Sequence, residues 1–164
     1  MIGRKAVLLR GTSEAGKSRL AFQLLQFLSN KANTFCRLVA DDQVHLQALG
    51  GRLVASPPLA LAGLLELRGV GILRVPYEHQ AQIGLVVDIL EEGELVEKSA
   101  RLPERADLMI TIAGVELPFL QFAQHDLAAI SVITQVMDCT GNNVENYWEG
   151  LAETTELVLS KKRK

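Results

Sequence analysis

The first part of the chain passes from a continuous apolar run to apolar residues at helical spacing. Residues 6–9 are all apolar, which is typical of a strand buried on both faces of a parallel sheet. A polar segment with two glycines follows, and beyond Ser18 the apolar positions predict an amphipathic helix with one buried stripe. These positions are Leu20, Ala21, Leu24, Leu25 and Leu28. The polar residues Ser29 and Asn30 mark the end of this helix.

Short apolar segments further along the chain predict strands. They are residues 36–40, 64–67, 72–75, 84–90 and 108–113. Two more segments, 44–46 and 52–55, flank Gly50 and Gly51 and predict a β-hairpin. Residues 59–65 follow two prolines and predict either a short helix or a loop.

Helical spacing returns in the last third of the chain. Residues 126–137 predict a helix with Asp126 as an acidic N-cap, and residues 145–159 predict a weaker last helix. Because several strands follow the first helix with few helices between them, the pattern favours a mixed sheet over a strict alternation of strands and helices. We therefore predict an α/β fold with a mixed central sheet flanked by helices.

The composition indicates one globular domain. The 164 residues are 48% apolar with a net charge of −2, which excludes disorder as the dominant state. We expect one domain over residues 1–160 and a solvated basic tail over 161–164. Acidic residues outnumber basic ones by 19 to 17, so we expect no nucleic-acid partner. No apolar run approaches the roughly 18 residues of a membrane span. Cys36 and Cys139 lie far apart, and we expect buried thiols in a reduced, cytoplasmic protein.

The segment between the first strand and the first helix fits the pattern G-x-x-x-x-G-K-[ST] at every fixed position. Its residues are Gly11, Thr12, Ser13, Glu14, Ala15, Gly16, Lys17 and Ser18. The glycines let successive N–H groups point at phosphate oxygens, with the positive end of the helix dipole behind them. Lys17 can reach the β- and γ-phosphates, and the Ser18 hydroxyl can ligate Mg²⁺. The alternative is a glycine-rich turn with a surface lysine. Glu14 must turn its carboxylate away from a bound triphosphate.

Three acidic sites compete for the roles of metal ligand and base. Asp41 and Asp42 end a predicted strand, where ligands commonly lie in open α/β sheets, although an acidic pair also caps turns. Glu66 lies within an apolar segment, where burying an unpaired charge is costly. Asp88 follows three apolar residues and is at least as well explained as an exposed strand residue.

Together these segments resemble the catalytic domain of the HPr kinase/phosphorylase family. The resemblance rests on the phosphate loop, on residues 37–42, and on a segment similar to the family pattern L-E-[IV]-R-G-[LIV]-G-[IL]. That segment is Leu65, Glu66, Leu67, Arg68, Gly69, Val70, Gly71 and Ile72. The resemblance covers about residues 6–112, and the short chain is similar to the form found in alphaproteobacteria. It implies a phosphate-loop, PEP-carboxykinase-like fold.

The resemblance also implies a function and a set of roles. The family phosphorylates a serine of HPr, the phosphocarrier of the sugar phosphotransferase system, with ATP and Mg²⁺, and reverses the reaction with inorganic phosphate. It implies that Lys17 is catalytic, that Ser18 and Glu66 hold Mg²⁺, and that Asp42 accepts the serine proton with Asp41 in support. Arg101 matches a position where the family places an active-site arginine. We also expect a homo-oligomer.

General chemistry agrees with these roles and leaves alternatives open. A serine hydroxyl needs a positioned acceptor as its proton leaves, and charge neutralisation supplies most of phosphoryl-transfer catalysis. Because successive strand side chains point to opposite faces, one of Asp41 and Asp42 could be structural. Arg68 and Arg101 could stabilise the transferring phosphoryl group or form surface ion pairs.

Two departures from the family concern the reverse reaction. The family carries a catalytic histidine in a pattern like I-H-[AG] before the phosphate loop, whereas His45, His79 and His125 all follow it here. The long forms also carry a P-V-[KR]-x-G-R-N segment, and residues 112–118 do not match it. Two alternative functions therefore remain: a small-metabolite kinase and a non-catalytic module that senses ATP.

Overall fold

The computed structural model describes residues 1–31, 34–91 and 105–139. Its helices and strands are, in chain order, β1 (Ala6–Arg10), α1 (Lys17–Ser29), β2 (His45–Leu49), β3 (Arg52–Ser56), the 3-10 helix η1 (Leu59–Leu61), β4 (Leu64–Leu67), β5 (Gly71–Arg74), β6 (Ala81–Leu90), the 3-10 helix η2 (Arg105–Leu108), β7 (Met109–Ile112), β8 (Val115–Ala123) and α3 (Ala129–Cys139). The predicted helix over 145–159 and the basic tail lie outside these residues.

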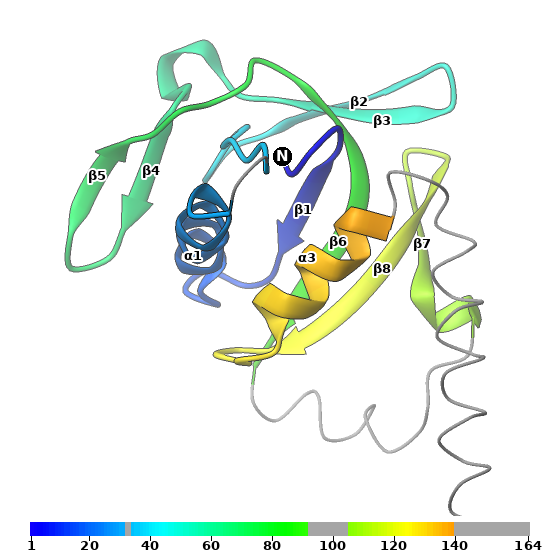
Figure 1. Cartoon of the computed structure of the whole chain (residues 1–164). Helices are drawn as coiled ribbons and strands as arrows, with labels where there is room; N and C mark the ends of the chain where they lie inside the picture. Colours follow the sequence, from blue (N-terminus) through cyan, green and yellow to red (C-terminus); the bar gives the residue numbers. More distant parts are fainter. Residues whose placement is uncertain (32–33, 92–104, 140–164) are drawn as a thin grey trace, which may run out of the picture.

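The central sheet is mixed, as the sequence predicts. Its six strands run β2-β3-β6-β8-β7, with β1 paired to β6 beside this path. The pairs β1–β6 and β6–β8 are parallel, whereas β2–β3, β3–β6 and β7–β8 are antiparallel. The carboxyl ends of β1, β6 and β8 therefore meet at one edge of the sheet, the lower edge in Figure 1. Open α/β sheets commonly place their ligands at such an edge.

Both described helices cover the same face of this sheet (Figure 1). The helical stripe that the sequence predicts is buried, and it packs with side chains of β6 and α3. The buried residues of this cluster include Leu20, Leu24 and Leu28 from α1, Leu85, Val87 and Ile89 from β6, and Ile133 and Val136 from α3. A second apolar cluster, which includes Leu8, Leu53, Val86 and Leu117, covers the opposite face.

Strands β4 and β5 form a separate antiparallel hairpin. Figure 1 shows this hairpin beside α1, away from the central sheet. Its side chains alternate, so that Leu65 and Leu67 are buried and Glu66 is exposed between them. The premise that Glu66 lies in a buried apolar segment is therefore wrong, because only every second residue of that segment faces inward.

The predicted strand over residues 36–40 does not form. Cys36 and Leu38 make only isolated bridges, to Ile2 and Tyr77, within the described residues. The apolar pattern there has another cause, since Cys36, Leu38 and Val39 are buried in irregular structure. Burial confirms the expectation for the Cys36 thiol and raises its pKa.

Strand β8 is the element that the sequence pattern does not reveal. Pro118, which lacks an N–H donor, argues against a strand in residues 115–123. In the structure this proline is the last residue of β8 that pairs with β7, opposite Met109, and the pairing of β8 with β6 begins at the next residue, Phe119. The predicted helix after Asp126 does form, and α3 begins at Ala129. Among the described residues no helix is long and apolar enough to cross a membrane.

Candidate nucleotide site

The phosphate loop joins β1 to α1 at the carboxyl edge of the parallel strands (Figure 1). Its first glycine is required by the close approach of β6. A Cβ atom on Gly11 would lie 2.6 Å from the carbonyl oxygen of Ile89. Gly16 precedes the helix in a left-handed conformation with φ of 89°, and no side chain of the described residues caps the helix there. The first N–H groups of α1 are therefore left for a ligand, and an anion suits them best.

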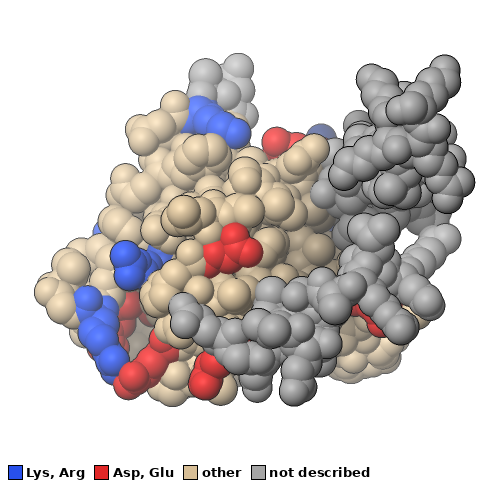
Figure 2. Space-filling view, turned by 90° about the horizontal axis from the view of Figure 1, so that it is seen from below, with Lys and Arg blue, Asp and Glu red and all other residues tan. Residues whose placement is uncertain are grey.

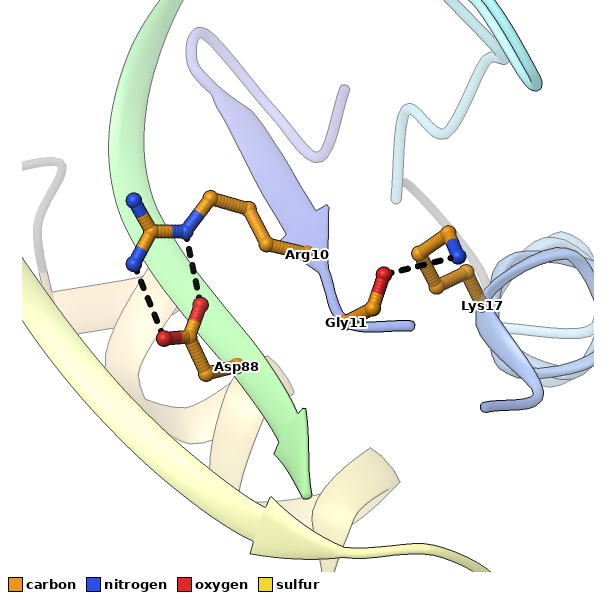
Figure 3. A network of polar contacts seen from close by, with 4 residues as sticks. All are labelled: Arg10, Gly11, Lys17 and Asp88. Carbon is orange, nitrogen blue, oxygen red and sulfur yellow. Dashed lines mark hydrogen bonds and ion pairs between the residues drawn. The ribbon is translucent and has the colours of Figure 1, made fainter. Parts of the chain in front are cut away.

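Lys17 lies across this loop (Figure 3). Its Nζ donates hydrogen bonds to the carbonyl oxygens of Gly11, at 3.1 Å, and Thr12, at 2.7 Å. The ammonium group is thus held at the loop that would surround the phosphates. Neither carbonyl neutralises its positive charge, so an anionic phosphate oxygen would be a stronger partner.

Ser18 contacts the acidic pair, Asp41 and Asp42, through Asp41. The Ser18 hydroxyl donates to Oδ1 of Asp41 at 2.7 Å, and the backbone N–H of Glu66 donates to Oδ2 at 2.9 Å. Asp41 therefore joins the start of α1 to the β4–β5 hairpin. Asp42, the other predicted acid, is exposed beside it. The Glu66 side chain is exposed on the same hairpin, next to the amide that contacts Asp41.

This arrangement fits a Mg²⁺ ion that arrives with a nucleotide. Within the described residues, no three His, Cys, Asp or Glu side chains come close enough together to hold a metal. Mg²⁺ is commonly held by a small number of protein oxygens together with substrate phosphates and water. The Ser18 hydroxyl and the carboxylates of Asp41 and Glu66 supply oxygen donors of this kind.

Glu14, the acidic residue of the phosphate loop, forms an ion pair with the β4–β5 hairpin. The carboxylate pairs with the Arg68 guanidinium, which lies beyond strand β4. This hydrogen bond lowers the pKa of Glu14 and raises the pKa of Arg68. Figure 2 views the molecule from the loop edge and shows basic and acidic side chains next to one another at the lower left, with further charged side chains near the centre and the upper edge. Arg68 is therefore engaged by a carboxylate instead of being free for a phosphoryl group.

Asp88 forms an ion pair within the sheet. Its Oδ1 and Oδ2 accept hydrogen bonds from Nε and Nη2 of Arg10, at 2.7 and 2.8 Å (Figure 3). The two residues are register partners on the parallel strands β1 and β6. The pairing raises the pKa of Arg10. Because both carboxylate oxygens are committed to Arg10, the structural interpretation of Asp88 is favoured over a metal ligand.

Two residues that the sequence analysis did not single out support the loop. The Thr12 hydroxyl donates to Oε1 of Glu91 at 3.3 Å, and Nε2 of Gln124 donates to the carbonyl oxygen of Glu14 at 3.0 Å. Glu91 follows the carboxyl end of β6, and Gln124 follows that of β8. Their positions after parallel strands were the only available signal, and β8 itself was not predicted. Arg101 lies outside the described residues.

The fold and the loop define a class of protein: an α/β protein with a phosphate-loop motif at the carboxyl edge of its parallel strands. Comparison with known proteins gives the family. The model of the HPr Serine kinase C-terminal domain matches residues 2–157, so the chain belongs to this family of enzymes. The predicted family resemblance is thereby confirmed.

The relatives agree with this assignment. The chain is 33% identical to an HPr kinase/phosphorylase of Enterococcus faecalis over 138 residues, which are 79% of this chain and 42% of that protein. It is 40% identical to one of Clostridium tetani over 90 residues, 55% of this chain and 27% of the relative. The chain thus spans less than half the length of these curated relatives.

A solved structure shares the fold. The structure of the Hpr(Ser) kinase/phosphatase from Coxiella burnetii superposes with a TM-score of 0.66 and 20% sequence identity. The match covers 88% of this chain and 93% of that one. This likeness confirms the mixed α/β fold with its central sheet and two helices.

Proposed function

We propose that this chain is an ATP- and Mg²⁺-dependent kinase that phosphorylates a serine of HPr. The observation that carries the proposal is the contact of Ser18 with Asp41, at 2.7 Å, at the start of the helix that follows the phosphate loop. The Ser18 hydroxyl and the β4–β5 hairpin both contact Asp41, which supports a metal site formed by Ser18 and neighbouring acidic residues. Family membership supplies the choice of HPr as the substrate.

The two acids of the pair take different parts in this proposal. Both oxygens of Asp41 already accept hydrogen bonds, one from Ser18 and one from the Glu66 amide. Asp41 therefore orients the hydroxyl that would contact Mg²⁺, and Glu66 contributes a further oxygen. Asp42 is exposed next to it and accepts the proton of the substrate serine as the hydroxyl attacks the γ-phosphorus.

Positive charge stabilises the transferring group. Lys17 exchanges its carbonyl partners for the β- and γ-phosphate oxygens, and Mg²⁺ supplies further charge neutralisation when it is bound. Arg68 joins this set only after leaving Glu14. Arg101 is proposed as a further active-site arginine. ADP is the leaving group, and the loop stabilises the negative charge on its two phosphates until it dissociates.

A phosphoryl-transfer assay tests the proposal. Purified protein is incubated with HPr, Mg²⁺ and ATP labelled in the γ-phosphate, and the labelled residue of HPr is mapped by mass spectrometry. We expect serine labelling that requires Mg²⁺. An HPr variant with that serine replaced by alanine is the substrate control. ATP binding without transfer to HPr would contradict the proposal and favour a sensing module. Transfer to a small metabolite alone would favour the metabolite kinase.

A further inference from the structure

Two cavities adjoin the phosphate loop on different faces of α1. One, of about 120 Å³, touches Lys17 and Asp41 and follows the helix face of Ala21, Leu24 and Leu25. The other, of about 150 Å³, follows the face of Arg19, Leu20 and Gln23, and shares Ala15 and Gly16 with the loop. At 100° per residue these two sets of positions point in nearly opposite directions from the helix axis.

The contacts of the loop give the direction of a bound nucleotide. Ser18 and Lys17 are the groups that serve the metal and the β- and γ-phosphates, and both lie towards Asp41. A terminal phosphate held by these two groups would lie on the side of the 120 Å³ cavity. The phosphate chain would then run back across the loop, and its nucleoside end would leave on the side of the 150 Å³ cavity, beside Arg19.

We propose that the 150 Å³ cavity, between the start of α1 and the turn that joins β8 to α3, receives the purine base of the nucleotide. This inference rests on the proposed nucleotide role of the loop and names where the rest of the ligand lies. In this proposed site the side chain of Leu127, which lies in that turn, covers the base.

The lining of this cavity suits a flat heteroaromatic ring. Its floor is made of buried apolar side chains, Leu20 from α1, Ile89 from β6 and Phe122 from β8. Its rim is polar and exposed, with Arg19 and Gln23 on one side and the turn on the other. An apolar floor with a few polar groups at the rim is the usual composition of a small-molecule site.

Leu127 is the unusual member of the rim. Its side chain is 96% exposed, although leucine gains from burial, and it lines the mouth of the cavity. A base in the cavity would cover part of this apolar surface. The turn is also built against the loop, since the Gln124 amide donates to the carbonyl oxygen of Glu14 at 3.0 Å. The next residue, His125, holds an uncommon φ of 68°.

A binding comparison separates the base from the phosphates. Calorimetry with Mg²⁺ measures the affinity of the wild type and of Leu127→Ala for ATP and for inorganic triphosphate, which has no base. We expect Leu127→Ala to weaken ATP binding by about five- to tenfold, because it removes apolar contact area, and to leave triphosphate binding within about twofold. Leu59→Ala, at a residue that is 88% exposed and lines neither cavity, is the matched control and should change neither affinity.

The same titrations distinguish failure of this inference from failure of the proposed function. Equal ATP affinity in the wild type and in Leu127→Ala would overturn the base site while the loop assignment stands. An equal loss of ATP and triphosphate binding would overturn it as well, since the effect would not involve the base. A wild type that binds neither ligand would overturn both proposals.

Photolabelling locates the base directly. Protein is irradiated with 8-azido-ATP in the presence of Mg²⁺, and the modified peptide is identified by mass spectrometry. Labelling within residues 122–130, most of which line the 150 Å³ cavity, supports the proposal. Labelling within residues 36–44, most of which line the other cavity, would place the base on the opposite side of α1 and overturn the proposal.

Discussion

The phosphate loop holds the Lys17 ammonium group in a position where it could contact a ligand of opposite charge. Its ammonium group donates to two carbonyl oxygens of the loop, which orient it without neutralising it. A triphosphate would offer charged acceptors at the same place, and hydrogen bonds to charged acceptors are roughly twice as strong as neutral ones. The lysine therefore contributes more to the state with developing phosphate charge than to the free protein.

We predict that Lys17→Ala weakens ATP binding and lowers the rate of transfer by about a hundredfold or more, because the β- and γ-phosphates lose their compensating charge. Calorimetry and the HPr labelling assay measure the two effects. Lys31→Ala is the matched control, because Lys31 is an exposed lysine beyond the end of α1, where its ammonium lies over the Phe27 ring. Unchanged binding and transfer in Lys17→Ala would show that the phosphate-loop assignment is wrong.

The acidic residues around Ser18 should separate into base and metal ligands. We predict that Asp42→Asn preserves ATP binding and lowers the kinase rate by about a hundredfold or more, the usual effect of removing a positioned base. Glu66→Gln should instead raise the Mg²⁺ concentration needed for half-maximal activity, and Asp41→Asn should act in the same way through Ser18. Rates measured against Mg²⁺ concentration check this division, and equal shifts in metal dependence for all three variants would contradict it.

The sequence identifies candidate residues of the site where a motif fixes their chemistry, and it does not reveal contacts between residues that distant segments bring together. The loop glycines, Lys17 and Ser18 follow from one short pattern. The contact of Ser18 with Asp41 depends on how the chain returns after α1, and the pairing of Arg10 with Asp88 depends on the register of β1 and β6. Neither of these two contacts can be predicted from a local sequence pattern.

At the scale of elements, the Arg10–Asp88 pair links two neighbouring parallel strands next to the phosphate loop. We predict that Asp88→Asn lowers the free energy of unfolding by about 1 kcal/mol, because it weakens a two-point hydrogen-bonded pair. The value is modest because the Arg10 side chain is 37% exposed and solvent screens the pair.

Urea unfolding of Asp88→Asn, Arg10→Met and the double variant measures the coupling between these two residues. ATP affinity and Mg²⁺ dependence should stay at wild-type values in Asp88→Asn. A large rise in the Mg²⁺ requirement of this variant, with little loss of stability, would instead identify Asp88 as a metal ligand.

A second link joins the phosphate loop to the β4–β5 hairpin through Glu14 and Arg68. We predict that Glu14→Gln tightens ATP binding a few-fold at low salt, since it removes a negative charge from the loop and releases Arg68. The gain should shrink at high salt, because both side chains are exposed. Titrations at low and high ionic strength check this. Weaker ATP binding in Glu14→Gln would show that the pair is needed to shape the loop.

The pH dependence of this link has a definite sign. The hydrogen bond with Arg68 lowers the pKa of Glu14, so the pair is fully formed above the ordinary pKa of a glutamate. It is lost as the pH falls through the lowered pKa. The difference in ATP affinity between the wild type and Glu14→Gln should therefore be constant around neutral pH.

Elements were predictable where the apolar period matched the final burial. This holds for β1 and α1. The β2–β3 hairpin was predictable from its turn glycines instead, since all five residues of β2 are exposed. The prediction of a strand is wrong for residues 36–40, because their apolar side chains fill the core although their backbone does not pair with a neighbouring strand. The apolar pattern also fails to reveal β8, where Pro118 suggests an interruption at the point where the partner strand changes.

The balance of forward and reverse reactions is a property of the whole molecule. The reverse reaction must bind inorganic phosphate beside an anionic phosphoserine, and this needs more positive charge than the forward reaction. The long family forms supply a basic P-V-[KR]-x-G-R-N segment. Residues 112–118 instead form the end of β7, the turn and the start of β8, and Glu116 there is acidic. Arg68 is occupied by Glu14.

We therefore predict that this chain is a much faster kinase than phosphorylase. Phosphoserine-HPr is incubated with millimolar phosphate and Mg²⁺, and pyrophosphate release is compared with the forward rate on the same preparation. The HPr kinase/phosphorylase of Enterococcus faecalis serves as the positive control, since its name states both activities. In the proposed forward reaction Lys17 and Mg²⁺ would hold one nucleotide, whereas the reverse reaction must bring two anions together. A reverse rate comparable to the forward one would overturn this argument and would require cations from elsewhere, such as a second copy of the chain, to complete the site.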